Sequence, residues 1–268
     1  MEKRTFTIGT TSFIIPDNII PNVKKIGRFF DEIELLVFES QPIDVVPSKH
    51  DVEILAHLGQ DLEVGYNVHL PVDVCLTAQT PSGRQQAADI LQSVVDRFFP
   101  LSPSTFTLHL DMDKGVSGVD AIAAWQEQAQ DGLARFVPRL EDPARISVET
   151  LWYDPAVLKT LVNRFGLSLC ADLGHHFKYG YDPHGTFEMF GKDIAIVHLH
   201  GVDLMGERPK DHIGLDRMEN DHFDQVVQCL SGYTGTVSLE VFNAANLQSS
   251  LARMSKWFLN IPVLDGLD

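Results

Sequence analysis

Histidine and carboxylate residues stand at the end of one short apolar run after another in this sequence. In residues 169–183, LCADLGHHFKYGYDP, an apolar run leads directly into Asp172, His175 and His176. Residues of the same kind end or closely follow the other runs: Glu39, His69, His109, Asp111, Glu149, His198, His200, Asp203 and Glu240. Mixed imidazole and carboxylate ligands suit Zn, Mn or Fe, and such sites can leave coordination positions open for catalysis. If the fold brings these residues together, they predict a catalytic metal site.

Each of these residues alone has a more ordinary explanation. A histidine such as His69 or His109 at the end of a strand is usually a hydrogen-bonded core or loop residue. Glu149 could pair with an arginine, and Asp172 could serve only as the N-cap of the next helix. These explanations fail for the whole set, because burying so many carboxylates and imidazoles in one place without a cation is very costly. A metal site is therefore the better interpretation.

The elements that must position these residues are strands that alternate with helices. Eight runs are rich in β-branched and aromatic residues, at 5–14, 32–40, 64–71, 105–111, 145–151, 167–173, 194–203 and 236–242. Amphipathic stretches with a helical period lie between or after them, at 83–99, 118–140, 154–166, 223–232 and 243–260. Ser82 and the Asp154–Pro155 pair mark expected helix starts.

The alternation predicts an α/β protein with one domain over residues 1–268, a (β/α)8 TIM barrel. A doubly wound sheet is the alternative, but no glycine-rich phosphate loop follows the first strand. In a barrel the C-terminal ends of the strands converge on one mouth, where active sites lie. The predicted fold would therefore gather the histidines and carboxylates in one place.

The composition of the chain limits which classes of molecule it is expected to bind. A net charge of −16 argues against binding to nucleic acid, which needs lysine and arginine to neutralise phosphates. Three scattered cysteines indicate a reducing compartment. No apolar run approaches the length of about 20 residues needed for a membrane span, and the N-terminus lacks a signal-peptide pattern. We expect a cytoplasmic protein with a small-molecule substrate and neither a nucleic-acid nor a membrane partner. The oligomeric state is not indicated.

The polar residues resemble the metal set of the xylose isomerase-like TIM barrels, a superfamily that includes sugar isomerases and epimerases and the type 2 AP endonucleases. The resemblance rests on Glu149, Asp172-Leu-Gly-His175, His200-Gly-Val-Asp203 and Glu240. It implies that one ion is bound by Glu149, Asp172, His200 and Glu240. It also implies that His175 supports a ligand from behind, contacts the substrate or binds a further ion. His176 would face the other way in a regular turn, so we expect it to be structural.

His69 and His109 are similar to the histidines that hold a second ion in the endonuclease branch, and Glu149 would then bridge the two ions. Endonucleases also carry an Asp-x-His pair for a third ion after the seventh strand. Residues 207–214 lack this pair in register. Its loss and the strong negative charge argue against cleavage of damaged DNA.

A narrower resemblance is to the cobamide-remodelling phosphodiesterases of the same superfamily. It rests on residues 9–23, 34–39, 67–71 and 210–215. The leading prediction is therefore a hydrolase with two divalent ions that cleaves the phosphoribosyl linkage of a corrinoid nucleotide. In this predicted hydrolase, Glu149 and Glu240 are catalytic residues as well as metal ligands. His175 or His212 steadies the phosphate or protonates the leaving oxygen. The residues expected to contact the substrate are Glu39, His175, Asp203 and Lys210.

Two alternatives stay open. The first is a sugar or sugar-phosphate isomerase or epimerase with one ion, in which Glu149 and Glu240 act as base and acid. His69 and His109 would then contact substrate hydroxyl groups. The second is a non-catalytic corrinoid or sugar-phosphate binding protein that keeps the ligand set without using it.

Overall fold

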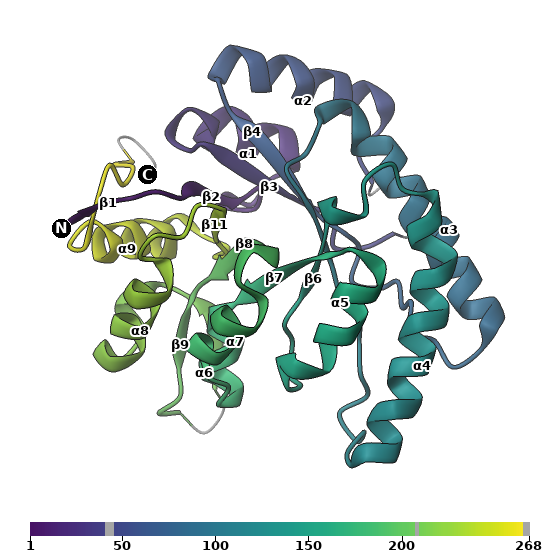
Figure 1. Ribbon diagram of the computed structural model, residues 1–268. Coiled ribbons are helices and arrows are strands. Elements are labelled where there is room, and N and C mark those ends of the chain that lie inside the picture. Colours follow the sequence, from purple (N-terminus) through teal and green to yellow (C-terminus); the bar gives the residue numbers. More distant parts are fainter. Residues whose placement is uncertain (41–45, 207–208, 265–268) are drawn as a thin grey trace.

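Eight parallel strands close into a barrel in the computed structural model, which describes residues 1–40, 46–206 and 209–264 (Figure 1). Their bounds are β2 Thr7–Thr11, β3 Glu32–Leu36, β4 Gly65–His69, β5 Phe106–Leu108, β6 Ile146–Glu149, β7 Ser168–Asp172, β8 Ile194–Leu199 and β11 Thr236–Leu239. Neighbours along the chain pair in register, and β11 closes the ring by pairing with both β8 and β2. Each predicted run holds one of these strands, so the predicted (β/α)8 barrel is confirmed.

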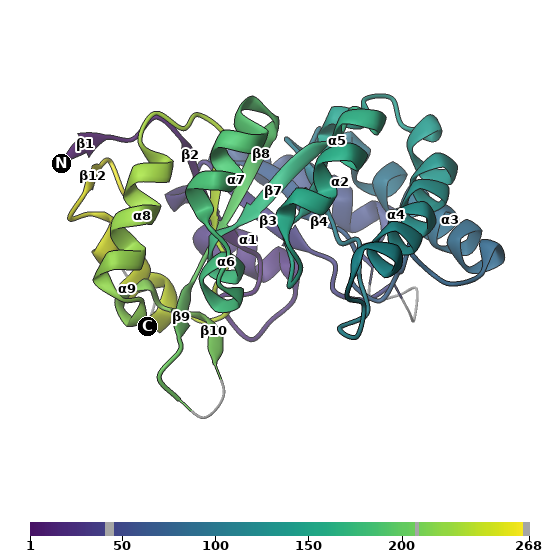
Figure 2. The same cartoon turned by 60° about the horizontal axis from the view of Figure 1, so that its bottom comes forward.

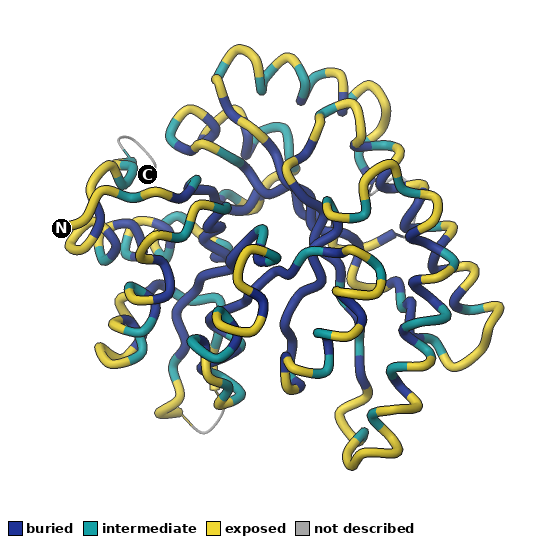
Figure 3. Tube along the Cα trace, viewed as in Figure 1, coloured by how far each residue is buried: buried dark blue, intermediate teal, exposed yellow. Residues whose placement is uncertain are grey.

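Helices surround the barrel and carry the exposed surface (Figure 3). Their bounds are α1 Ile19–Ile26, α2 Lys49–Leu62, α3 Pro81–Phe98, α4 Val119–Phe136, α5 Lys159–Phe165, α6 Leu173–Tyr179, α7 Pro183–Phe190, α8 Asn220–Leu230 and α9 Ala244–Met254. Fully buried side chains such as Phe98 on α3, Phe136 on α4 and Phe223 on α8 fill the layer between strands and helices. Each contributes about 1.5–3 kcal/mol of burial free energy.

Caps set where two predicted helices begin. Helix α3 begins at Pro81, one residue before the predicted Ser82, because the Thr80 hydroxyl accepts the Gly83 N–H at 3.1 Å and proline fits the first helical position. Asp154 caps the next element as predicted, accepting the Ala156 N–H at 2.9 Å. That element opens as a short 3-10 turn before α5.

Two small sheets lie outside the barrel. Strand β1 (Glu2–Lys3) pairs with β12 (Phe258–Leu259), and β9 (Gly201–Asp203) pairs with β10 (Lys210–Ile213) as an antiparallel hairpin that extends beyond the barrel (Figure 2). The predicted run 194–203 is thus divided between β8 and β9. Within the described part of the chain, no helix is long and apolar enough to cross a membrane.

The interior of the barrel is polar. The Glu34 carboxylate on β3 approaches Ser238 on β11 and His198 on β8, and neither strand neighbours β3 in the ring. These side chains therefore point into the barrel. Leu35, the residue after Glu34 on β3, points the opposite way and packs into the outer core, because successive side chains of a strand alternate between its two faces. Most barrels fill this space with branched apolar residues. Here polar and charged side chains, including Glu34, His198 and Ser238, occupy this space.

Candidate active site

The C-terminal ends of the strands deliver the predicted residues to one mouth. Glu149 and Asp172 are the last residues of β6 and β7, and His69 is the last residue of β4. His109, His200 and Glu240 each directly follow a strand. Because all these strands are parallel and closed, their side chains meet inside the barrel.

Three carboxylates and one imidazole form the first group, the carboxylate cluster, defined as Glu149, Asp172, Glu240 and His198. One ligand atom from each lies within 4.8 Å of the others, and the whole cluster is buried. His198 Nδ1 lies 3.3 Å from Glu240 Oε2 and 3.8 Å from Glu149 Oε2. The predicted set had His200 in this place. The structure instead puts His198 among these atoms.

His200 lies in an adjoining group, the histidine cluster, defined as Asp172, His175, His200 and His212. His200 Nε2 is 3.2 Å from Asp172 Oδ1, and the His212 backbone N–H donates to His200 Nδ1 at 3.0 Å. The rings of His200 and His212 stack at 4.1 Å. His200 Nδ1 also lies 3.2 Å from the Gly201 carbonyl oxygen, so contacts on both ring nitrogens fix the orientation of the imidazole.

His69, His109 and Glu149 form the third group, the paired-histidine cluster. His69 Nε2 and His109 Nε2 lie 3.2 and 2.8 Å from Glu149 Oε2. The other nitrogen of His69 donates to the Leu70 carbonyl at 2.9 Å, which leaves Nε2 as the lone-pair side in the neutral ring. A lone pair facing a carboxylate needs a proton or a cation between them. This arrangement fits the predicted second ion.

Local structure explains why Asp172 can serve two purposes. Its Oδ1 accepts the His175 N–H at 2.8 Å and so caps α6, whereas its Oδ2 lies 3.0 Å from His175 Nδ1. The cap and the ligand interpretations are therefore compatible. His176 points away from the cluster and bonds to the Asp172 carbonyl and the Thr186 hydroxyl, as its predicted structural role requires.

The family can now be assigned from sequence as well as from this geometry. A family model described as the xylose isomerase-like TIM barrel matches residues 20–260. This chain belongs to that family. The match confirms the superfamily resemblance seen in the sequence.

Solved structures of xylose isomerase-like barrels resemble this one along nearly the whole chain. A D-tagatose 3-epimerase-like protein superposes with a TM-score of 0.78 at 19% identity, covering 94% of this chain and 97% of that one. D-psicose 3-epimerase from Clostridium cellulolyticum H10, solved with D-tagatose, gives 0.65 at 13%, covering 96% and 91%. An AP endonuclease of family 2 from Brucella melitensis gives 0.64 at 15%, covering 95% and 99%. At these identities the likeness shows the fold alone.

No protein of curated function matches the sequence. None of these matches supports the narrower resemblance to cobamide-remodelling phosphodiesterases.

Electrostatics in this xylose isomerase-like barrel favour ionised carboxylates. Burial opposes ionisation of Glu149, but His109 and other imidazoles hold its pKa well below the usual value. Burial likewise opposes ionisation of Glu240, yet His198 and His212 hold its pKa well below normal. Burial lowers the pKa of His212, but Asp211 and Glu240 outweigh it and raise that pKa to about 11. Protonated imidazoles thus compensate the carboxylates when no ion is bound.

The residues present fit a divalent cation. Glu240 Oε2 and His198 Nδ1 are buried without a hydrogen-bond partner in the described ranges, although they face each other. Buried polar atoms are otherwise satisfied in proteins. A cation coordinated among these oxygens and nitrogens would satisfy both atoms, and the mixed oxygen and nitrogen donors suit Mn, Fe or Zn.

Three predicted substrate residues lie outside the clusters. Glu39 is exposed beyond the end of β3, Lys210 is exposed at the start of β10, and Asp203 pairs with it in the hairpin register. Residues 207–208, part of the stretch compared with the endonucleases, lie outside the described residues. Roles for these residues remain predictions.

Glu34 was missed by sequence reasoning, and His198 was noticed without a role. Both are fully buried inside the barrel. The signal was present in the alternation of β3, where Glu32 and Glu34 share one face and Ile33 and Leu35 share the other.

Aromatic side chains border the mouth. Phe13, Phe38 and Phe242 follow β2, β3 and β11. The Phe38 ring contacts each of the other two edge to face, with ring centroids 6.0 Å apart. Phe242 also stacks on His212 at 5.1 Å. Phe13 and Phe38 are 44% and 40% exposed, so an apolar wall leads from the surface to the histidine cluster.

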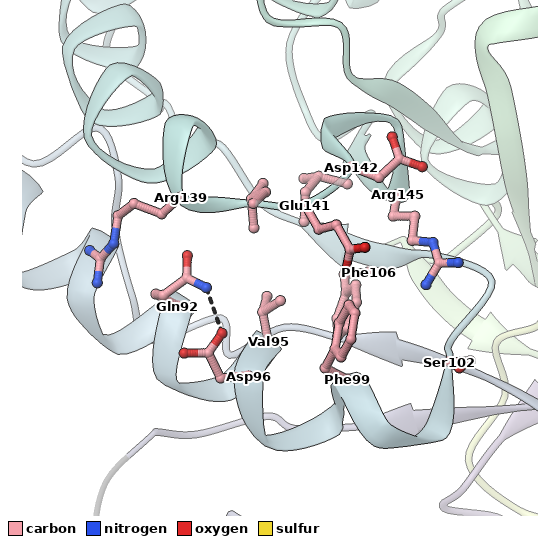
Figure 4. A pocket seen from close by; sticks show the side chains of 12 residues that line it. Gln92, Val95, Asp96, Phe99, Ser102, Phe106, Arg139, Glu141, Asp142 and Arg145 are labelled. Atoms are coloured by element: carbon pink, nitrogen blue, oxygen red, sulfur yellow. Dashed lines mark hydrogen bonds between the residues drawn. The ribbon is translucent and has the colours of Figure 1, made fainter.

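A separate cavity of about 540 Å³ lies at the opposite end of the barrel (Figure 4). Its lining includes Phe106 and Ile146, the first residues of β5 and β6, with the guanidinium groups of Arg139 and Arg145 on opposite sides. None of the clustered residues lines it. It is therefore not part of the candidate active site.

Proposed function

We propose that the protein is a divalent-metal-dependent isomerase or epimerase that acts on a sugar or a sugar phosphate. The observation that carries this proposal is the carboxylate cluster, in which two buried glutamates from β6 and β11 lie beside Asp172 and a strand-end imidazole. The fold likeness to epimerase structures also supports the proposal of an isomerase or epimerase.

The chain's own groups can perform the proton transfers. Glu149 and Glu240 come from β6 and β11, strands separated in the ring by β7 and β8, so they reach the mouth from different sides. Their lowered pKa values make each an available base near neutral pH. One glutamate would remove the proton from the carbon beside the carbonyl and, now protonated, would return a proton to that carbon or its neighbour. Delivery from the opposite side would require the other glutamate first to take up a proton from solvent.

A divalent ion held by Glu149, Asp172, Glu240 and an imidazole from the end of β8 would polarise the substrate's carbonyl and hydroxyl oxygens. His175 lies 3.0 Å from Asp172 and 3.5 Å from Glu149, and its side chain is 14% exposed. It can therefore hydrogen-bond a substrate oxygen while its ring is oriented by the carboxylates. The phenylalanine wall borders the same space through the stacking of Phe242 on His212.

The test is solvent proton exchange. Purified protein with Mn²⁺ is incubated in D₂O with a panel of ketoses, aldoses and their phosphates, and deuterium at carbon is followed by NMR. We expect incorporation and an isomeric product. Glu149→Gln should lower the rate by a factor of about 10²–10⁴, as loss of a general base does. Glu53→Gln is the matched control, because this side chain is 73% exposed on α2.

The paired-histidine cluster favours a second candidate, a two-ion phosphodiesterase. His69 and His109 converge on the same oxygen of Glu149 that faces the carboxylate cluster, as a bridging ligand would require. Two ions per chain together with release of a riboside from a cobamide would support this hydrolase. One ion per chain and deuterium exchange into a sugar would support the isomerase.

A further inference from the structure

Glu34 is buried beside His198 of the carboxylate cluster, and the proposed chemistry gives Glu34 no role. Both side chains are fully buried, and they come from β3 and β8, which face each other across the barrel. His198 Nε2 lies 2.9 Å from Glu34 Oε1. A carboxylate and an imidazole at this depth are costly to bury unless each satisfies the other.

The two atoms that approach form an ion pair and not a regular hydrogen bond. Within the part of the chain that the structure describes, Glu34 Oε1 and both His198 nitrogens are buried without a hydrogen bond of ordinary geometry, and the Cys170 thiol on β7 also lies against the His198 ring. The other oxygen of Glu34 is fixed, because the Ser238 hydroxyl donates to Glu34 Oε2 at 2.5 Å. Ser238 is the register partner of His198 on the neighbouring strand β11. One oxygen of the carboxylate is therefore held by Ser238, and the other faces the His198 ring.

Orientation of the His198 ring decides what its other nitrogen faces. With Nε2 toward Glu34, Nδ1 is directed at Glu240 Oε2, 3.3 Å away, and at Glu149 Oε2, 3.8 Å away. A carboxylate behind an imidazole fixes both the ring orientation and the nitrogen that carries the proton. Glu34 is thus connected through a single ring to both glutamates of the proposed reaction.

We propose that Glu34 is a positioning residue that acts through His198 on Glu240 and Glu149. The side-chain contacts of Glu34 in the described residues are to Ser238 and His198, so its connection to the two glutamates runs through the imidazole. For its kinetic consequences this inference rests on the proposed isomerase function. Its consequences for ring geometry and for ion binding do not depend on the reaction.

The chain supplies a matched control two residues earlier. Glu32 also points into the barrel, where its Oε2 accepts hydrogen bonds from Asn67, Ser104 and Thr236. Its hydrogen bonds involve neither His198 nor any cluster residue. Glu32→Gln removes the same charge from the same strand and face without touching the proposed connection.

The experiment compares Glu34→Leu, Glu34→Gln and Glu32→Gln with the unaltered protein. Leucine keeps the approximate volume and removes the acceptor, whereas glutamine keeps an acceptor oxygen for the ring. The readouts are the Mn²⁺ dissociation constant by calorimetry, the ring ¹⁵N signals of His198 by NMR, and kcat and KM. Histidine signals are assigned by their loss in His198→Gln.

We expect Glu34→Leu to weaken Mn²⁺ binding and to lower kcat by a factor of about 10–100, the usual effect of removing the partner behind a site residue. KM should change by less than a factor of about two, because Glu34 does not contact substrate. The Nε2–H signal of His198 should shift or exchange with solvent. Glu34→Gln should recover most of the loss, and Glu32→Gln should match the unaltered protein.

Each contrary result overturns the proposal. If Glu34→Leu and Glu32→Gln have the same Mn²⁺ affinity, His198 signals and kcat, Glu34 only fills the interior. If Glu34→Gln loses as much affinity and kcat as Glu34→Leu, the charge of Glu34 matters and the orientation of the ring does not. If Glu34→Leu does not fold, Ser238→Ala decides: it releases the carboxylate from one side, and an unchanged His198 signal would refute the connection. If the unaltered protein turns over no sugar, the proposed function fails, yet the NMR measurement still tests the positioning role because it needs neither ion nor substrate.

Discussion

Gly174 provides the sharpest test of where the structure puts the His200 ring. This glycine lies in the first turn of α6 and is buried. A Cβ built on it would stand 2.0, 2.3 and 2.4 Å from three atoms of the His200 imidazole, far inside van der Waals contact. The ring has little room to yield, because Asp172, the His212 N–H and the stacked His212 ring hold it.

Gly174→Ala should therefore destabilise the protein. Overpacking a rigid site costs about 1–3 kcal/mol, and alanine regains about 1 kcal/mol over glycine inside a helix. The expected net loss is about 0–2 kcal/mol, or up to about 8 °C in Tm at 2–4 °C per kcal/mol for a domain of this size. In a His200→Ala background the methyl group fits, so the same substitution should stabilise by about 0.5–1 kcal/mol.

The assay is a double-mutant cycle from urea unfolding of the four proteins without metal. A coupling free energy of about 1–3 kcal/mol between Gly174→Ala and His200→Ala is expected. Gly115→Ala is the control and should be neutral, because its Cβ would meet nothing within 4 Å. Additive free energies would refute the reasoning, since they would mean that the His200 ring does not lie against Gly174.

Three further outcomes follow from the same structure. Mn²⁺ at a hundredfold excess over its dissociation constant should raise the free energy of unfolding by about 2.7 kcal/mol, and chelation should reverse the shift in Tm; an unchanged Tm would contradict the metal site. His212 and Lys178 lower the pKa of Asp211, so its contribution to stability is complete above its ordinary pKa. The contribution is lost progressively as pH falls from that value through the lowered pKa of the folded state. Asp211→Asn should therefore cost up to about 1 kcal/mol at pH 7, with the difference shrinking below pH of about 4 in urea titrations. Phe98→Ala, in the outer core and fully buried, should cost about 3–5 kcal/mol while leaving Mn²⁺ affinity unchanged, and a parallel loss of affinity would show that core and site are coupled.

Local patterns in the sequence were sufficient for the barrel and for the place of its site. Strand runs are short and β-branched, seven of the eight end in or are closely followed by a histidine or a carboxylate, and strand ends in a closed parallel barrel must converge. Glu149, Asp172 and Glu240 could therefore be placed together before any coordinates. Helix α2 was equally readable, since Ser48 and Asp51 form a capping box, but that signal was overlooked.

Only the tertiary structure decided which groups the side chains face. His198 and His200 are two residues apart and chemically identical, yet His198 turns toward Glu34 and Glu240 and His200 toward Asp172 and the His212 backbone. Those partners come from strands and loops distant in sequence, so no local pattern contains them. The sequence alone determines which residues reach the mouth, because alternation and strand ends are local properties. Ring orientation depends on hydrogen bonds across the barrel, and these exist only once all eight strands have closed.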